Sequence, residues 1–128
     1  MLDLEALDQE HTRWIAMGGA LAGVDLEIRH VGPKQQEKFR QKMIRDGILK
    51  KADGGVEIAS GRQDDFFRAY AEHYVSNWRG QIKPEGAVYD PKIMGIVLGK
   101  YQIAFEQIGK ALSEEADFFS QNGAASIA

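Results

Sequence analysis

The chain has 128 residues, a formal net charge of -3 and no cysteine. This length suits one domain that buries about two-thirds of its unfolded surface. The absence of cysteine excludes thiolate catalysis and cysteine-ligated zinc, and it fits a reducing cytoplasm. The slight negative charge gives no general attraction to nucleic acid. We find no secretory signal in residues 1–10 and no uncharged apolar run of about 18 residues, so we expect no membrane span.

The first third of the chain changes from two-residue to helical periodicity. Apolar and polar residues alternate along Val24–Val31, after a short apolar run around Trp14, and predict a β-hairpin over Thr12–Val31. Gly32-Pro33 then breaks the strand, and apolar residues at helical spacing predict a helix near 34–46. Residues 51–61 are rich in glycine and predict a loop that adds one brief strand at most.

The remainder of the chain is predicted to be helical. An aromatic stripe predicts a helix near 64–78, with Gly80 as its closing residue; the stripe comprises Phe66, Tyr70, Tyr74 and Trp78. Asp90 and Pro91 are typical of a helix start, and they predict helices near 91–99 and 101–119. Ile93, Met94, Val97 and Leu98 form the predicted apolar face there, and Gly95 and Gly99 indicate close packing or a bend.

These elements predict an α+β fold, in which an N-terminal β-hairpin or small antiparallel sheet packs against about four helices. No linker is long enough to separate two domains, so we expect residues 1–128 to form a single domain. Its ends, about 1–10 and 120–128, are expected to fray.

The sequence contains no constellation that indicates catalysis. The run Gly95–Lys100 has three residues between its glycines and no Ser or Thr after the lysine, so it is not a phosphate loop. The histidines are too scattered for a metal site, and the serines include no nucleophile elbow. The carboxylates Asp64 and Asp65 are explained by the start of the aromatic helix. We therefore expect neither an enzyme nor a cofactor or metal site.

Two groups of residues are candidate partner-binding sites. A locally basic segment gives either a solvated helix face or a contact surface for another protein; its candidate residues are Lys34, Lys38, Lys42 and Arg45. Phe118 and Phe119 follow the last predicted helix and give either an exposed patch or a core contact. The aromatic stripe is interpreted as core, in preference to a platform for single-stranded nucleic acid.

The order of these features resembles the tail assembly chaperones of long-tailed phages and prophages. The resemblance begins with a hairpin that carries Trp14 and Leu26–Arg29, followed by a basic helix from Pro33. It continues with a helix that ends in Asn77–Gly80 and with the helix start Val88–Pro91. Together these parts cover about Thr12–Phe119.

This resemblance implies a non-catalytic protein of the host bacterial cytoplasm. Its expected partner is the tape measure protein, which the chaperone keeps soluble while tail tube subunits gather around it. Contacts with the tail tube protein, with a frameshifted longer form of the chaperone and with further copies of itself are compatible with the same family. In this family the longer form carries a C-terminal extension. This chain ends at Ala128 without one and would correspond to the shorter form. The resemblance supplies no catalytic residue. From charge and composition, we expect neither nucleic acid nor a membrane as a partner.

Two other classes of protein remain open. A structural virion component, such as a head-tail joining or tail completion protein, would share the size and the mixed fold but would stay in the finished particle. A nucleic-acid-binding regulator would use the basic segment, and its affinity would fall steeply with added salt.

Overall fold

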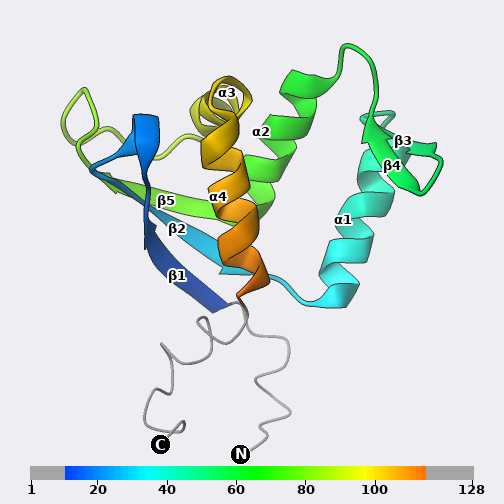
Figure 1. Cartoon of the computed structure of the whole chain (residues 1–128), viewed down its shortest axis with the longest axis horizontal. Coiled ribbons are helices and arrows are strands. Elements are labelled where there is room, and N and C mark those ends of the chain that lie inside the picture. The colour runs from blue at the N-terminus through cyan, green and yellow to red at the C-terminus, as the bar shows by residue number, and fades with distance from the viewer. Residues whose placement is uncertain (1–10, 115–128) are drawn as a thin grey trace, which may run out of the picture.

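A computed structural model describes residues 11–114 and gives the predicted α+β fold. Two groups of elements can be distinguished (Figure 1). The first, which we call the body, contains β1 (His11–Ala16), the 3-10 helix η2 (Gly19–Leu21), β2 (Val24–His30), α2 (Gln63–Tyr74), β5 (Val75–Gly80), α3 (Pro91–Lys100) and α4 (Gln102–Ser113). The second, which we call the arm, contains α1 (Pro33–Arg45), β3 (Leu49–Ala52) and β4 (Gly55–Ile58).

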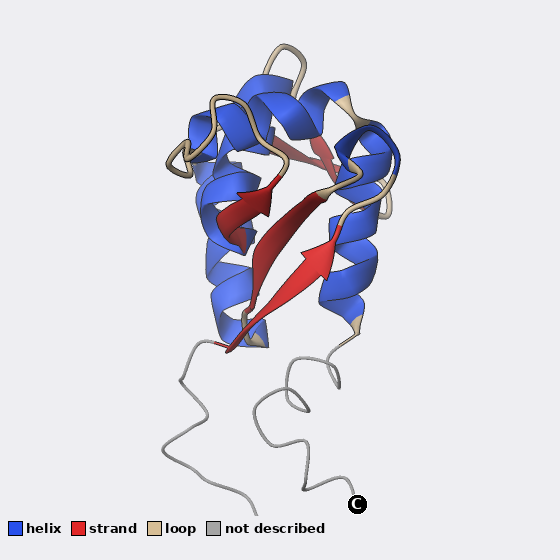
Figure 2. Cartoon of the chain, turned by 90° about the vertical axis from the view of Figure 1, so that its left-hand side faces the viewer, coloured by secondary structure: helices blue, strands red, loops and turns tan. Residues whose placement is uncertain are grey.

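The body is built around a three-stranded antiparallel sheet of order β1-β2-β5. Its central strand β2 places Leu26 and Ile28 on one face, where both are fully buried. Leu26 pairs with Ile15 of β1 and with Trp78 of β5, so apolar residues from all three strands meet on that face. The strands run side by side with helices around them (Figure 2). The predicted N-terminal hairpin is confirmed, with a register that places Ile15, Leu26 and Ile28 in the core.

The predicted helix near 64–78 is wrong in its last turn. Helix α2 ends at Tyr74, and Val75–Gly80 form strand β5 instead. Val75 is fully buried opposite Ile28, and the ladder to β2 satisfies backbone groups that the helix would otherwise have used. Trp78 therefore belongs to the sheet, and its indole N–H donates to the carbonyl of Ala87 at 2.8 Å. Pairing with a distant strand has overridden the local four-residue periodicity.

Gly80 has a different role from the predicted helix stop. It ends β5 with a φ of 109°, and a Cβ there would collide with the carbonyl oxygen of Gly23. Glycine is needed because β2 and β5 approach closely at this end of the sheet.

Helices α2, α3 and α4 cover the apolar face of the sheet (Figure 1). A Cβ on Gly95 would lie 2.8 Å from the Cα of Arg68, so α3 packs directly on the backbone of α2. The chain bends at Tyr101, and α4 starts at the next residue. Both the close packing and the bend that the two glycines indicated are present. Helix α4 ends at Ser113, earlier than the predicted end near residue 119, and residues 115–119 lie outside the described residues.

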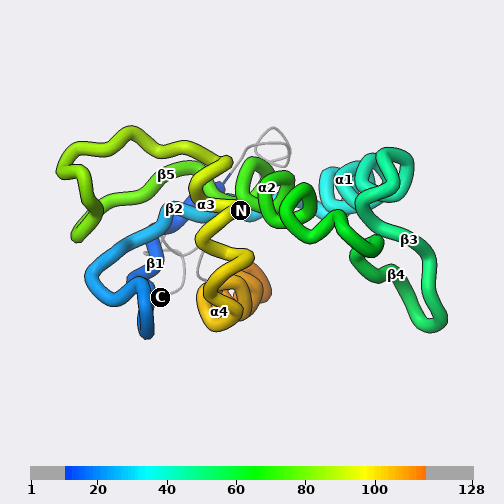
Figure 3. The backbone as a smooth tube through the Cα atoms, turned by 90° about the horizontal axis from the view of Figure 1, so that it is seen from above, coloured from blue at the N-terminus to red at the C-terminus, as the bar shows by residue number. Residues whose placement is uncertain are grey.

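The arm extends to one side of the body, as the view from above shows (Figure 3). The segment predicted as a loop with one brief strand is a complete hairpin, β3–β4, with four paired positions. Its small core consists of Met43, Ile48 and Leu49. Phe39 of α1 connects the arm to the body by stacking on His73 of α2, with ring centroids 4.1 Å apart. The arm is thus a local unit held against α2 by aromatic contacts.

Candidate partner-binding surfaces

The predicted basic residues of α1 form one exposed stripe. Lys34, Lys38, Lys42 and Arg45 follow one another at intervals of four, four and three residues, which places them on one side of the helix. All are exposed, whereas Phe39 and Met43 face the arm core. Arg45 lies 3.8 Å from the carboxylate of Asp46, and no ion pair involves the three lysines within residues 11–114. The structure therefore brings together four of the six predicted site residues. The other two, Phe118 and Phe119, lie outside the described residues.

A second surface was not predicted from the sequence. The large apolar side chains that are most exposed in the described chain all fall between residues 88 and 103: Val88 (87%), Ile93 (48%), Ile96 (72%) and Ile103 (68%). Ile93 was assigned to the buried face of its helix, and the structure contradicts that assignment. Grouping of exposed aliphatic residues in one short segment is typical of an interaction surface.

The orientation of α3 explains this exposure. Met94, Gly95 and Leu98 are buried against α2 and the sheet, so the opposite side of the helix faces solvent. At 100° per residue, Ile93, Ile96 and Lys100 lie within about 60° of one another on that side. We call these three residues the α3 ridge.

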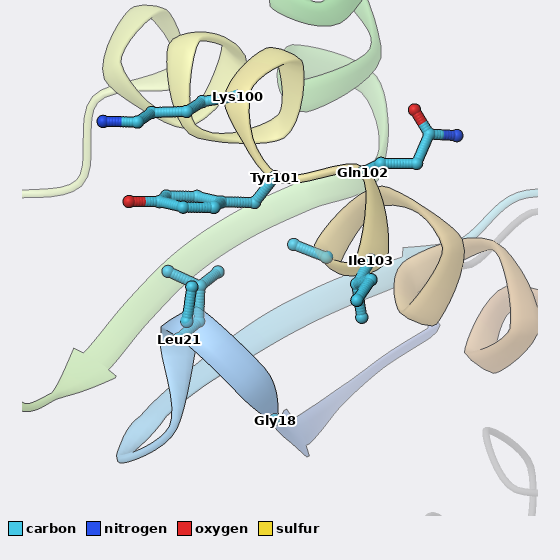
Figure 4. Close-up of a pocket in the computed structure, with 8 residues that line it drawn as sticks. Gly18, Leu21, Lys100, Tyr101, Gln102 and Ile103 are labelled. Atoms are coloured by element: carbon cyan, nitrogen blue, oxygen red, sulfur yellow. The ribbon is translucent and has the colours of Figure 1, made fainter.

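A small pocket adjoins the ridge where α3 meets α4 (Figure 4). Its volume is about 280 Å³, and its lining is mostly apolar. Leu21 of η2 and Tyr101 point toward the hollow, and Ile103 comes from the first turn of α4 (Figure 4). Lys100 also lines it, with its ammonium nitrogen 5.5 Å from the centroid of the Tyr101 ring. We call this hollow the Tyr101 pocket.

Gln107 fixes one wall of the Tyr101 pocket. Its side-chain amide donates to the carbonyl of Ala16 at 2.9 Å and accepts from the amide of Gly18 at 3.1 Å. One glutamine of α4 thereby holds both the end of β1 and the start of the η2 segment. The pocket is therefore set by contacts between distant parts of the chain and is not the property of one flexible loop.

Two further hollows in the described part of the chain are polar and contain ion pairs. One contains Arg13 and Glu114, which lie 3.2 Å apart. Another contains Arg62 and Asp65 at 2.6 Å, and also Arg68 and Glu72. Within residues 11–114, no three His, Cys, Asp or Glu residues are grouped so that they could hold a metal ion.

The groups with shifted pKa values belong to the core. Burial, reinforced by the neighbouring Tyr74, raises the pKa of Tyr70 far above its usual value. Burial likewise raises the pKa of Tyr74 and of Tyr89. These phenols stay protonated at neutral pH and take part in packing. The described surface carries one basic stripe, on α1, and one group of exposed aliphatic residues between Val88 and Ile103.

One signal in the sequence could have revealed the apolar surface. At 100° per residue, Ile93, Met94, Ile96, Val97 and Leu98 cover about 200° of the circumference of the predicted helix. An apolar arc this wide has more hydrophobic surface than one buried face uses.

We find no helix in the described part of the chain that is long and apolar enough to cross a membrane.

Comparisons of the chain with protein-family models, with curated proteins and with solved structures find no match.

Proposed function

We propose that this chain is a non-catalytic assembly chaperone of the phage tail type, which binds the tape measure protein and is released during tail assembly. The observation that carries the proposal is the gathering of exposed aliphatic residues between Val88 and Ile103. The ordered resemblance from Trp14 to Phe119 supplies the identity of the client. The exposed basic stripe of α1 gives a second place for contact with a protein.

The physical logic of such a chaperone is mass action. A protein that binds an exposed apolar segment lowers the concentration of the free segment and so disfavours its aggregation. The contact must also be reversible, because tail tube subunits have to replace the chaperone. A small group of exposed aliphatic residues with two lysines beside it suits that requirement, since small interfaces are typical of weak and transient complexes.

Co-expression in bacterial cells tests the proposal. We expect the tape measure protein of the same phage or prophage to remain in the soluble fraction when this chain is present and to be largely insoluble when it is absent. Two double variants test the surfaces predicted from the sequence. Lys38→Glu with Lys42→Glu reverses charge on the basic stripe, and Phe118→Ser with Phe119→Ser makes the C-terminal aromatic pair polar. Each should reduce the soluble client while the thermal unfolding midpoint of the chaperone stays unchanged.

Two results would overturn the proposal. One is a client that is equally insoluble with and without this chain. The other is a fixed stoichiometry of this chain in purified mature particles, measured by mass spectrometry, because a permanent component is not a chaperone. That second result would favour a structural virion protein instead.

A further inference from the structure

We propose that the α3 ridge and the Tyr101 pocket together bind an amphipathic helix of another protein whose aliphatic stripe is flanked by carboxylates. This inference rests on the proposed function, for which it names the docking surface and the chemistry of the client. It concerns a surface that is separate from the basic stripe of α1.

The two parts form one continuous surface. Ile96 and Lys100 are four residues apart on the exposed side of α3, and Lys100 also lines the Tyr101 pocket with Ile103. The pocket accepts a side chain at the end of the ridge, between Leu21 and Ile103 (Figure 4). Its volume of about 280 Å³ is at the lower limit of small-molecule sites, so one or two aliphatic side chains fit it better than a cofactor.

The charges beside the ridge select the partner. Lys92 and Lys100 are both exposed, and neither forms an ion pair with a described residue. The nearby carboxylate of Asp90 caps the helix by accepting from the backbone amide of Lys92 at 2.9 Å. Glu106, one turn beyond Ile103, ends this cationic stretch and interacts with Gln102. A partner should therefore place its carboxylates over α3 and its apolar residues over Ile96 and the pocket.

The same charges disfavour a second copy of this chain as the occupant. A two-fold contact of α3 with α3 would bring Lys92 and Lys100 toward the same lysines of the partner copy. Like charges placed opposite one another weaken association. A helix is also the natural partner shape, because a ridge of side chains three and four residues apart packs into the groove of another helix.

Synthetic peptides provide the test. The first probe is a fluorescent helical peptide of about 18 residues, with leucines at helical spacing and glutamates beside them. The second has the same leucines with lysines in place of the glutamates. We expect the full chain to bind the acidic peptide at least about tenfold more tightly than the basic one, measured by fluorescence anisotropy.

Matched variants locate the contact. Ile96→Ser with Ile103→Ser should weaken binding of the acidic peptide by about tenfold or more, since both side chains are exposed and their loss leaves the core intact. Lys92→Glu with Lys100→Glu should reverse the preference toward the basic peptide. The control Lys51→Glu with Lys83→Glu changes as much charge at exposed positions outside α3 and α4, and it should leave the affinity for the acidic peptide unchanged.

The inference is overturned if both peptides bind equally, if neither binds, or if the control variant weakens binding as much as the ridge variants do. A concentration-dependent dimer in sedimentation that Ile96→Ser abolishes would assign the ridge to self-association and would also overturn it. Co-expression separates this outcome from the proposed function. A client that stays soluble with the Ile96→Ser, Ile103→Ser variant leaves the chaperone proposal standing and removes only the ridge as its site.

Discussion

The body and the arm bury their apolar residues in different ways. The body buries twelve apolar residues in one cluster, from segments as far apart as Ile15 and Ala111. The arm buries three, all between Met43 and Leu49, and adds partly buried neighbours from α1, β4 and α2. Contacts that are few and local give a region a lower free energy of opening than the domain as a whole. We infer that the apolar ridge sits on the stiff part of the molecule and the basic stripe on the softer part.

The largest expected effect comes from the centre of the body. Ile28 is fully buried on the central strand, so Ile28→Ala should lower the free energy of unfolding by about 2–5 kcal/mol. Chemical denaturation followed by fluorescence and by circular dichroism should show one shared transition. A loss below about 1 kcal/mol would mean that the body is packed no better than the arm.

The matched change in the arm should act locally. Met43→Ala removes a buried side chain of the small arm core, where truncation costs about 2–5 kcal/mol. If this cost exceeds the free energy of opening of the arm, the arm unfolds locally. The destabilisation of the folded protein by the substitution is then limited to that free energy. Hydrogen exchange should accelerate for amides of residues 33–58 and stay unchanged in β2 and α4. Equal acceleration throughout would show that the two regions unfold as one unit.

Glycines on α3 and α4 test the contact between helices of the body. Gly95→Ala should destabilise by about 1–3 kcal/mol, because the new Cβ meets the backbone of Arg68, which has little freedom to move away. Gly109→Ala is the matched control: a Cβ added there would meet no other atom within 4 Å, so the change should stabilise by about 0.5–1 kcal/mol. The two variants should therefore shift the thermal midpoint in opposite directions. A stabilising Gly95→Ala would contradict the close approach of α3 to α2.

The smallest expected effect appears at alkaline pH and is confined to the body. Burial raises the pKa of Tyr70 above its usual 10.0. Its contribution to stability is therefore complete below about pH 10 and is lost as the pH rises toward the pKa in the folded state. Tyr70→Phe keeps the ring and removes the titration, so it should lose less unfolding free energy between about pH 8 and pH 11 than the parent does. Residues 33–58 contain no tyrosine, so the arm should not contribute to this loss. An unchanged alkaline slope in the variant would contradict the buried position of Tyr70.

Sequence patterns located most elements because each depends on neighbours in the chain. The hairpin of β1 and β2, the start of α1 after Gly32-Pro33 and the Asp90 cap of α3 were all predicted, and local periodicity or capping chemistry determines each of them. The exposed basic stripe was also predicted. Lysines repeated every four residues lie on the side of the helix opposite its apolar face, and that side is exposed to solvent when the apolar face is buried.

The tertiary structure alone decided the state of residues 75–80 and the exposure of α3. The aromatic spacing that ends in Trp78 is equally compatible with a helix, and only the free edge of β2 turns that segment into a strand. Likewise, the apolar arc of α3 is wider than one buried face, so the sequence does not decide which of its residues are buried. The contact of Gly95 with α2 chooses the buried face and thereby leaves Ile93 and Ile96 to solvent. Periodicity predicts that a helix has an apolar face. The long-range contact that buries part of this face decides which of its residues remain exposed for binding.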